Sequence, residues 1–299
     1  MKMAHSSFFL RLFVSLCVMV AGLFSVAGGA VCEAGDPALR LGVLANKGAA
    51  EAFRKWRPLA DYLASGIDRP VEVIPLDFSQ LRQAVADDDL DLVIANPLNF
   101  IEFQDLYGVV PLATMEKKGL PLMGGVIFTR KDSSITSLGQ LAGKRIAAVS
   151  LDSLGGFLMQ AYTLKRAGVD VTARTTPTFL KNHDHVVFAV LNGAVDAGFV
   201  RTDQLEGMAK RGAIFMGDFR IVNALTHKDF PYACSTELVP DWPVCATRRL
   251  SKAMQQRVAQ ALLTLPGDAP AAKAAGITGF VPAGDYTTVS EAMKAVGLK

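Results

Sequence analysis

The chain has 299 residues, of which 51% are hydrophobic and 20% are charged. This composition excludes an intrinsically disordered chain and supplies enough apolar material for a packed core. The formal net charge is only +3, and the basic residues are scattered, so a nucleic-acid partner is not supported.

The first 30 residues have the pattern of a secretory signal peptide. Lys2 and Arg11 come before an apolar run from Leu12 to Ala27, and small residues follow at 28–30. The run of about 16 residues is short for a bilayer span of roughly 20. An uncleaved anchor, or a lipid attached at Cys32, is the alternative. We expect residues 1–30 to be cleaved and the mature chain to be exported.

Strand and helix patterns alternate from residue 39 to residue 95. The predicted strands are 39–44, 71–76 and 90–95, and the predicted helices are 49–64 and 78–86. This alternation is the signature of an α/β fold with a parallel sheet.

The alternation restarts after a predicted strand at 124–129. The strands of this second part are 145–149, 169–175, 197–200 and 219–225, and its helices are 155–167 and 186–192. A further helix is predicted at 251–265.

The order of elements predicts two α/β lobes. Lobe one would comprise residues 38–128 and 225–299, and lobe two residues 129–224. Strands near 124–130 and 219–227 would cross between the lobes as a hinge, so closure would bury a ligand between them.

Polar turns follow several of the predicted strands, which is where ligands bind in open α/β sheets. A helix start offers unpaired N–H groups and a positive dipole end, so it can hold an anion. The candidate residues in these turns are Asn46, Asn96, Asn99, Phe100, Ser150, Ser153 and Gly155. Simple helix capping by Ser153 or Asp152 is the alternative.

Three charged or titratable residues of the second lobe are further candidates. His183 precedes a helix and would donate to an anion, whereas capping is its alternative role. A metal site shared with His185 is less well supported, because the sequence has neither HExxH nor CxxC. Arg201 and Asp203 follow the strand at 197–200. Asp203 could position an amine or accept from a protonated oxyanion, or it could cap a helix.

Cys234 is the one candidate nucleophile. A reactive thiolate needs a nearby base or cation, which His183 or His227 would provide. A disulfide to Cys245, eleven positions on, and a free thiol lining the cleft are the alternatives. The sequence has no GxxxxGK[ST], no GxGxxG and no nucleophile elbow, so we do not expect an enzyme.

Five stretches resemble the periplasmic phosphate/phosphite/phosphonate-binding proteins of ABC importers. They are Trp56–Leu63, Asp91–Pro97, Ser137–Lys144, His183–Asp184 and Asn192–Gly198. The resemblance covers nearly the whole mature chain and implies the two-lobed type II periplasmic-binding fold with two crossing hinge strands.

The same resemblance implies how an oxyanion is held. The ligand would be bound by a Ser/Thr-rich turn, which falls on Ser150 to Gly155, by His183 and by an aromatic residue at Phe100. Leu151-Asp152-Ser153-Leu154-Gly155 stands here in place of the usual Ser-Thr-Ser-Gly, and Phe100 in place of a Tyr.

Residues 232–243 are similar to the input domains of tetrathionate-type sensor histidine kinases. We therefore expect a periplasmic solute-binding protein that captures a small oxyanion, phosphonate-like, phosphate-like or of sulfur, in the interlobe cleft. It would present the ligand to an ABC permease for transport or to a membrane sensor kinase for two-component sensing.

The expected ligand-binding residues are Asn46, Asn96, Asn99, Phe100, Ser150, Ser153, Gly155, His183, Arg201, Asp203 and Cys234. We expect a monomer with no cofactor, no metal and no nucleic-acid partner. An exported enzyme that uses Cys234 as a nucleophile or redox thiol is the alternative.

Overall fold

The computed structural model describes residues 36–45, 48–170 and 177–298. The chain divides into two units, 1–37 and 38–299, and the helices and strands described below belong to the second. The predicted signal peptide lies outside the described residues. Within the described residues, no helix has both the length and the apolarity that crossing a membrane requires.

The first sheet has six strands in the order β13-β4-β12-β3-β1-β2. The strands are β1 Leu39–Leu44, β2 Val71–Leu76, β3 Leu92–Ile94, β4 Val110–Glu116, β12 Pro243–Ala246 and β13 Gly279–Pro282. β1 pairs in parallel with β2 and β3, whereas β4 and β12 add antiparallel pairs. The helices of this part are α2 Ala49–Ile67, α3 Phe78–Ala86, α4 Pro97–Tyr107, α8 Lys252–Leu263 and α9 Pro270–Ala275.

The second sheet has five strands in the order β10-β6-β9-β7-β8. They are β6 Gly125–Arg130, β7 Ile146–Ala148, β8 Thr178–Phe179, β9 Ala197–Arg201 and β10 Phe219–Val222. Its helices are α5 Met159–Arg166, which follows a π-helical turn at Leu154–Leu158, α6 His183–Leu191 and α7 Gln204–Lys210. The predicted strand at 169–175 falls mostly on residues outside the described ones.

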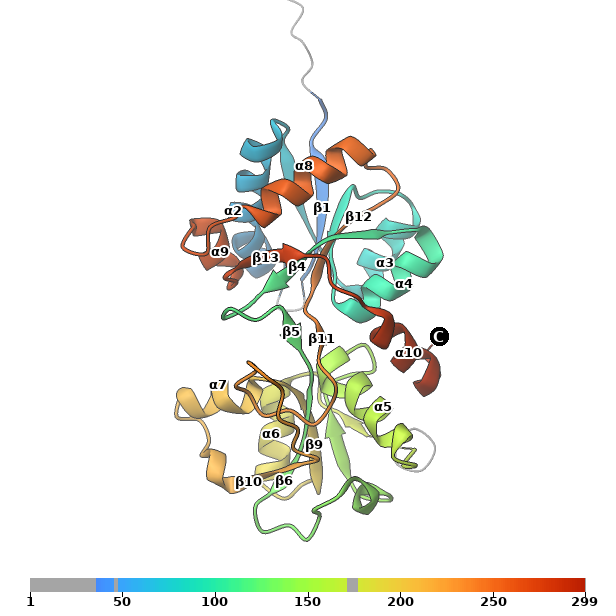
Figure 1. The fold of residues 1–299 in the computed structure, drawn as a ribbon, viewed down its shortest axis with the longest axis vertical. Helices are drawn as coiled ribbons and strands as arrows, with labels where there is room; N and C mark the ends of the chain where they lie inside the picture. The colour runs from blue at the N-terminus through green and yellow to red at the C-terminus, as the bar shows by residue number, and fades with distance from the viewer. Residues whose placement is uncertain (1–35, 46–47, 171–176, 299) are drawn as a thin grey trace, which may run out of the picture. The chain divides into compact units, whose positions relative to one another are not determined.

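Two very short strands carry the chain between the sheets. β5 Leu122–Met123 and β11 Val239–Pro240 pair antiparallel in a ribbon of their own (Figure 1). The predicted crossing strands near 124–130 and 219–227 are misplaced, because β6 and β10 pair with each other inside the second sheet. The apolar run at 124–130 marks a buried strand, whereas a two-residue crossing has no periodic pattern to recognise. The predicted lobe boundaries stay a prediction.

Residues 235–236 fasten the second crossing segment to β6. Ser235 N–H donates to the Gly125 carbonyl at 2.8 Å, and Ser235 Oγ accepts from Ile127 N–H at 2.9 Å. Thr236 Oγ1 accepts from Gly125 N–H at 2.9 Å. These side chains therefore satisfy backbone N–H groups of β6 at the end of its pairing with β10, at Ile127, and beyond it, at Gly125.

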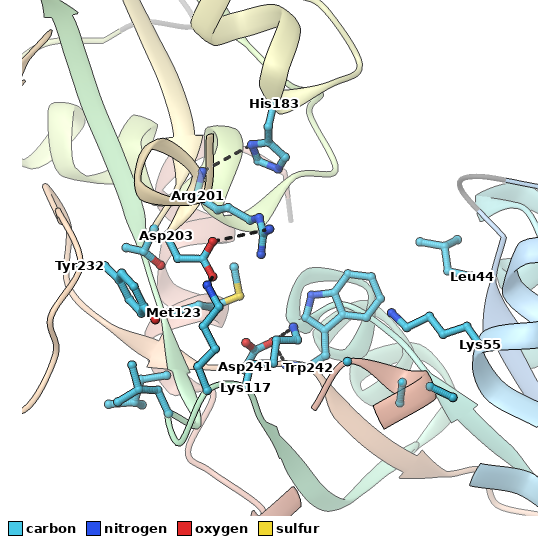
Figure 2. A pocket seen from close by; sticks show the side chains of 18 of the residues that line it. Leu44, Lys55, Lys117, Met123, His183, Arg201, Asp203, Tyr232, Asp241 and Trp242 are labelled. Atoms are coloured by element: carbon cyan, nitrogen blue, oxygen red, sulfur yellow. Dashed lines mark hydrogen bonds and ion pairs between the residues drawn. The ribbon is translucent and has the colours of Figure 1, made fainter. Parts of the chain in front are cut away.

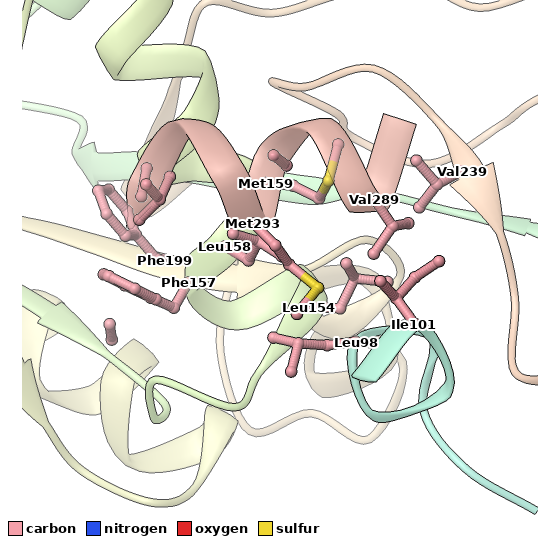
Figure 3. Close-up of a cluster of buried hydrophobic side chains, with 14 of the residues drawn as sticks. Leu98, Ile101, Leu154, Phe157, Leu158, Met159, Phe199, Val239, Val289 and Met293 are labelled. Atoms are coloured by element: carbon pink, nitrogen blue, oxygen red, sulfur yellow. The ribbon is translucent and has the colours of Figure 1, made fainter. Parts of the chain in front are cut away.

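One apolar cluster spans the two parts. The C-terminal helix α10, Thr287–Val296, brings Val289 and Met293 against Leu98 and Ile101 of α4 and against the turn that contains Leu154 (Figure 3). We refer to this contact as the apolar seam. The seam fixes helices of both sheets to α10 without contributing to the cavity described below.

Met293→Ala should lower the free energy of unfolding by about 2–5 kcal/mol, because Met293 is 3% exposed and the change leaves a cavity in the seam. Urea or thermal unfolding measures the loss. Leu106→Ala is the matched control, since Leu106 is 64% exposed and its loss should change stability by less than about 0.5 kcal/mol. Equal stability of the two variants would contradict this role of α10.

Candidate functional site

A cavity of about 700 Å³ lies between the two sheets, beside the crossing strands (Figure 2). Both sheets contribute to it from the carboxyl ends of their strands, as expected for open α/β sheets. Leu44 ends β1, Arg201 ends β9, and His183 begins the helix that follows β8. The hairpin at 117–120 and the segment at 230–232 complete the wall.

The charged side chains of the cavity are mostly basic. Five basic residues line it, namely Lys55, Lys117, Lys118, Arg201 and Arg211, together with the acidic residues Glu51, Asp203 and Asp241. A partly enclosed, net-positive space of this kind favours an anion. Within the described residues no cluster of His, Cys, Asp and Glu is suited to a metal ion.

Several of these cations are already paired with carboxylates. Lys118 Nζ lies 2.9 Å from Asp203 Oδ2, and Lys117 Nζ lies 2.7 Å from Asp241 Oδ1. Arg201 Nη2 lies 3.8 Å from Asp203 Oδ1. An anion that enters must therefore exchange with internal partners as well as shed water.

Aromatic rings lie beside the lysines. Lys55 Nζ is 4.5 Å from the centre of the Trp56 ring, and Lys117 Nζ is 5.6 Å from that of Trp242. The Tyr232 ring holds Lys118 in the same manner at 5.1 Å. These cation–π contacts orient the ammonium groups without neutralising them.

His183 is neutral and offers one N–H to the cavity. Arg201 N–H donates to His183 Nδ1 at 3.5 Å, so the proton of the neutral ring sits on Nε2. The pKa of His183 is lowered to about 3, first by burial and second by the nearby Arg201 charge, while Asp203 opposes the shift. His183 can thus donate a hydrogen bond to an anion but brings no positive charge at neutral pH.

Three of the predicted site residues, His183, Arg201 and Asp203, are brought together in this cavity. The residues of the turn after β3 do not line the cavity. Asn96 caps α4 by accepting from Asn99 N–H at 3.0 Å, and Phe100 packs edge-on against Tyr286 with ring centres 5.0 Å apart. Asn99 Nδ2 is buried without a hydrogen-bond partner, yet it does not line the cavity.

The turn after β7 also lies outside the cavity lining. Ser153 Oγ folds over Gly156, where an added Cβ would approach it to 2.6 Å. Asp152 is paired with Arg82 of α3 at 3.1 Å, and Arg82 also binds Glu102. Neither these contacts nor the lining support the predicted role of Ser150 and Ser153 as cavity ligands.

Gly155 supports the cavity wall from behind. A Cβ at this position would lie 2.7 Å from the Gly124 carbonyl oxygen and 2.9 Å from Arg201 Cβ. Only a glycine allows the turn to approach β6 and β9 this closely. Its contribution is to position Arg201, and its predicted contact with the ligand is not supported by the lining. The remaining candidate, Asn46, lies outside the described residues.

Cys234 and Cys245 are both free and buried, so the disulfide considered above is wrong. Cys245 is part of β12 in the first sheet, whereas Cys234 packs against the start of β6 in the second. Cys234 Sγ donates to the Thr236 carbonyl at 3.1 Å, and burial raises the pKa of the thiol. Cys234 does not line the cavity, and its protonated thiol is a poor nucleophile.

Sequence reasoning missed most of the basic and aromatic lining. Trp56 lies within the predicted helix at 49–64, and it is only 4% exposed although it borders the cavity. The Lys117-Lys118-Gly119 turn between two strands, and Trp242 at the end of the second crossing, were the available signals. Their place in the cavity depends on the crossing strands, which have no periodic pattern.

The family model for the periplasmic substrate-binding protein of phosphonate ABC transporters matches residues 41–287. The chain belongs to this family. A solved structure with the same fold is XAC2383 from Xanthomonas citri bound to ATP, which is 24% identical with a TM-score of 0.70. That match covers 88% of this chain and 96% of the other.

Two curated relatives share part of their length with this chain. The tetrathionate sensor histidine kinase TtrS of Salmonella typhimurium is 32% identical over 241 residues, which is 77% of this chain and 40% of the kinase. The phosphate-import protein PhnD of Mycolicibacterium smegmatis is 25% identical over 198 residues, 61% of this chain and 59% of that protein. The chain thus spans less than two thirds of either relative.

The depressed pKa of His183 predicts a pH-dependent stability. Between pH 6.5 and about 3 the unfolded chain binds a proton on this residue that the folded chain does not, so the free energy of unfolding falls as pH falls. An uptake of one full proton on unfolding would change the free energy of unfolding by about 1.4 kcal/mol per pH unit. Because His183 is partly exposed, we expect a smaller slope.

The melting temperature of His183→Asn should therefore fall less than that of the wild type when the pH is lowered from 7 to 5. Thermal unfolding across that range measures the difference. His185→Asn provides the matched control, since His185 is exposed two residues further on. Identical pH profiles for the wild type and His183→Asn would contradict the neutral state of this half-buried ring.

Proposed function

We propose that this chain is an exported solute-binding protein that captures a small oxyanion in the cavity between its two sheets. The proposed ligand class is a phosphonate-like or phosphate-like anion or a sulfur oxyanion. The observation that carries the proposal is the meeting of Lys55, Lys118, Arg201 and the His183 N–H around one space. Membership of a family of periplasmic substrate-binding proteins supports the same reading.

The ligand contacts proposed from the structure differ from those that the sequence alone predicts. Arg201 and Lys118 provide charge, His183 Nε2–H provides a neutral donor, and Trp242 provides an apolar face (Figure 2). A fully ionised oxyanion accepts hydrogen bonds only, so this set of donors matches it. The turn after β7 does not belong to this proposed set of contacts, because its residues do not line the cavity.

Binding rather than catalysis is the proposed role. The alternative of an enzyme built on Cys234 needs a thiolate in contact with the ligand, and the buried thiol donates to a backbone carbonyl instead. His227 Nε2 is hydrogen-bonded to the Thr236 carbonyl at 3.2 Å and lies outside the cavity lining. No observation favours a reaction at this site.

The proposed setting is the periplasm, after removal of residues 1–30. One relative is named as a sensor kinase and another as an import protein. We therefore propose that the liganded chain is read by a membrane partner, either an ABC permease or a sensor histidine kinase. Both would recognise the arrangement of the two sheets around a bound anion.

The two tryptophans of the chain, Trp56 and Trp242, both line the cavity, so intrinsic fluorescence reports directly on binding. Titration with phosphate, phosphite, methylphosphonate, sulfite, thiosulfate and tetrathionate should give saturable changes with at least one anion. Arg201→Met should weaken that binding by about tenfold or more, because a hydrogen bond to a charged group contributes roughly 1.5–3 kcal/mol.

Arg166→Met is the matched control. Arg166 is a solvent-exposed arginine that pairs with Glu237 away from the cavity, and its loss should leave the affinity unchanged. An absence of saturable binding by every anion of the panel would overturn the proposed function. Equal losses of affinity in Arg201→Met and Arg166→Met would contradict a direct contact between Arg201 and the ligand.

A further inference from the structure

Asp203 directs its carboxylate into the cavity instead of capping the helix it precedes. The residue stands at the start of α7 with a φ of 68°, and its side chain makes no capping hydrogen bond. Its two oxygens face cations. Lys118 Nζ lies 2.9 Å from Oδ2. Arg201 Nη2 lies 3.8 Å from Oδ1 (Figure 2). A non-glycine residue in the left-handed region is uncommon and indicates a constraint on this position.

The pair formed by Lys118 and Asp203 joins the two parts of the chain across the cavity. Lys118 belongs to the hairpin that follows β4 of the first sheet, and Asp203 follows β9 of the second. Hydrogen bonds between Lys117 and Leu120, at 2.9 and 3.0 Å, shape that hairpin. The carboxylate thus occupies the two cations that an incoming anion would use.

We propose that Asp203 is an internal counter-ion that must be displaced by the ligand, and that it thereby excludes simple anions from the cavity. This inference rests on the proposed function. A tethered carboxylate competes at a high effective concentration, so a free anion with no better contacts cannot replace it. Acetate offers the same two oxygens, and chloride offers a single contact.

An oxyanion with three or four oxygens can accept more hydrogen bonds than the two oxygens of the carboxylate. It can contact Lys118 and Arg201 and also accept from His183 Nε2–H, which Asp203 leaves available. Lys118 keeps its contact with the Tyr232 ring when Asp203 departs, so the cation stays at the cavity wall. Displacement of Asp203 would also release the hairpin from the second sheet, which couples binding to a change between the two parts.

Asp203→Asn tests this directly, because Asn tolerates the left-handed backbone and keeps the size of the side chain. Tryptophan fluorescence is measured in chloride-free buffer with phosphate, thiosulfate, acetate and chloride as probes. The variant should bind the oxyanion about tenfold more tightly than the wild type, because a competing negative charge has been removed. Acetate and chloride should bind the variant at concentrations that leave the wild type unchanged.

Lys118→Met should act in the opposite direction and weaken oxyanion binding, since it removes a cation that the ligand would take over. Glu237→Gln is the matched control, because Glu237 is an exposed carboxylate paired with Arg166 outside the cavity. Its loss should change neither the affinity nor the range of anions bound.

The outcomes separate this inference from the proposed function. Weaker or unchanged oxyanion binding by Asp203→Asn, with binding by the wild type intact, would overturn the counter-ion role and leave the function standing. Oxyanion binding by the variant alone would support the counter-ion role, and the six-anion panel on the wild type would still decide the proposed function. An absence of binding by wild type and variant alike, with all six oxyanions of the panel, would overturn both.

Discussion

The antiparallel contact between β5 and β11 is the constraint on which the site depends. Each strand has two residues, and only two residue pairs join them, Val239 with Met123 and Pro240 with Leu122. These crossings bring the carboxyl ends of two separate sheets to one space, so residues of both sheets line the same cavity. The fastening of Ser235 and Thr236 to β6 gives the crossing a fixed starting point.

The interface between the two parts has two chemically different sides. On the seam side, Met293 and Leu154 pack in an apolar cluster, and the pair of Arg82 with Asp152 lies at the turn after β7. On the cavity side, lysines, arginines and tryptophans border open space. Apolar packing resists separation in water, whereas ion pairs exchange readily with ligand or solvent. Movement is therefore easier on the cavity side, where Lys118 and Asp203 meet.

The fold was largely predictable because its helices and buried strands follow simple periods. The predicted helix at 49–64 corresponds to α2, and the predicted strand at 39–44 corresponds to β1. The two α/β units could be predicted because the alternation of strands and helices restarts after the first unit. The crossings were misplaced because a two-residue strand gives no alternation to detect. The π-helical turn at Leu154–Leu158 was equally invisible, because the close approach of Gly155 to the Gly124 carbonyl is a tertiary contact that leaves no period in the sequence.

The candidate site was predictable only where a polar residue follows a strand of the second sheet. His183, Arg201 and Asp203 obey that rule, and the cavity contains all three. Ser153 obeys it as well, yet its hydroxyl folds over Gly156, and the neighbouring Asp152 pairs with Arg82 of α3. Position at a strand end therefore brings a residue near the site, but the nearest countercharge decides where its side chain turns. For Asp152 that charge is Arg82 of α3, away from the cavity, and for Asp203 it lies in the cavity, so two carboxylates that follow strands of the second sheet have different consequences for ligand binding.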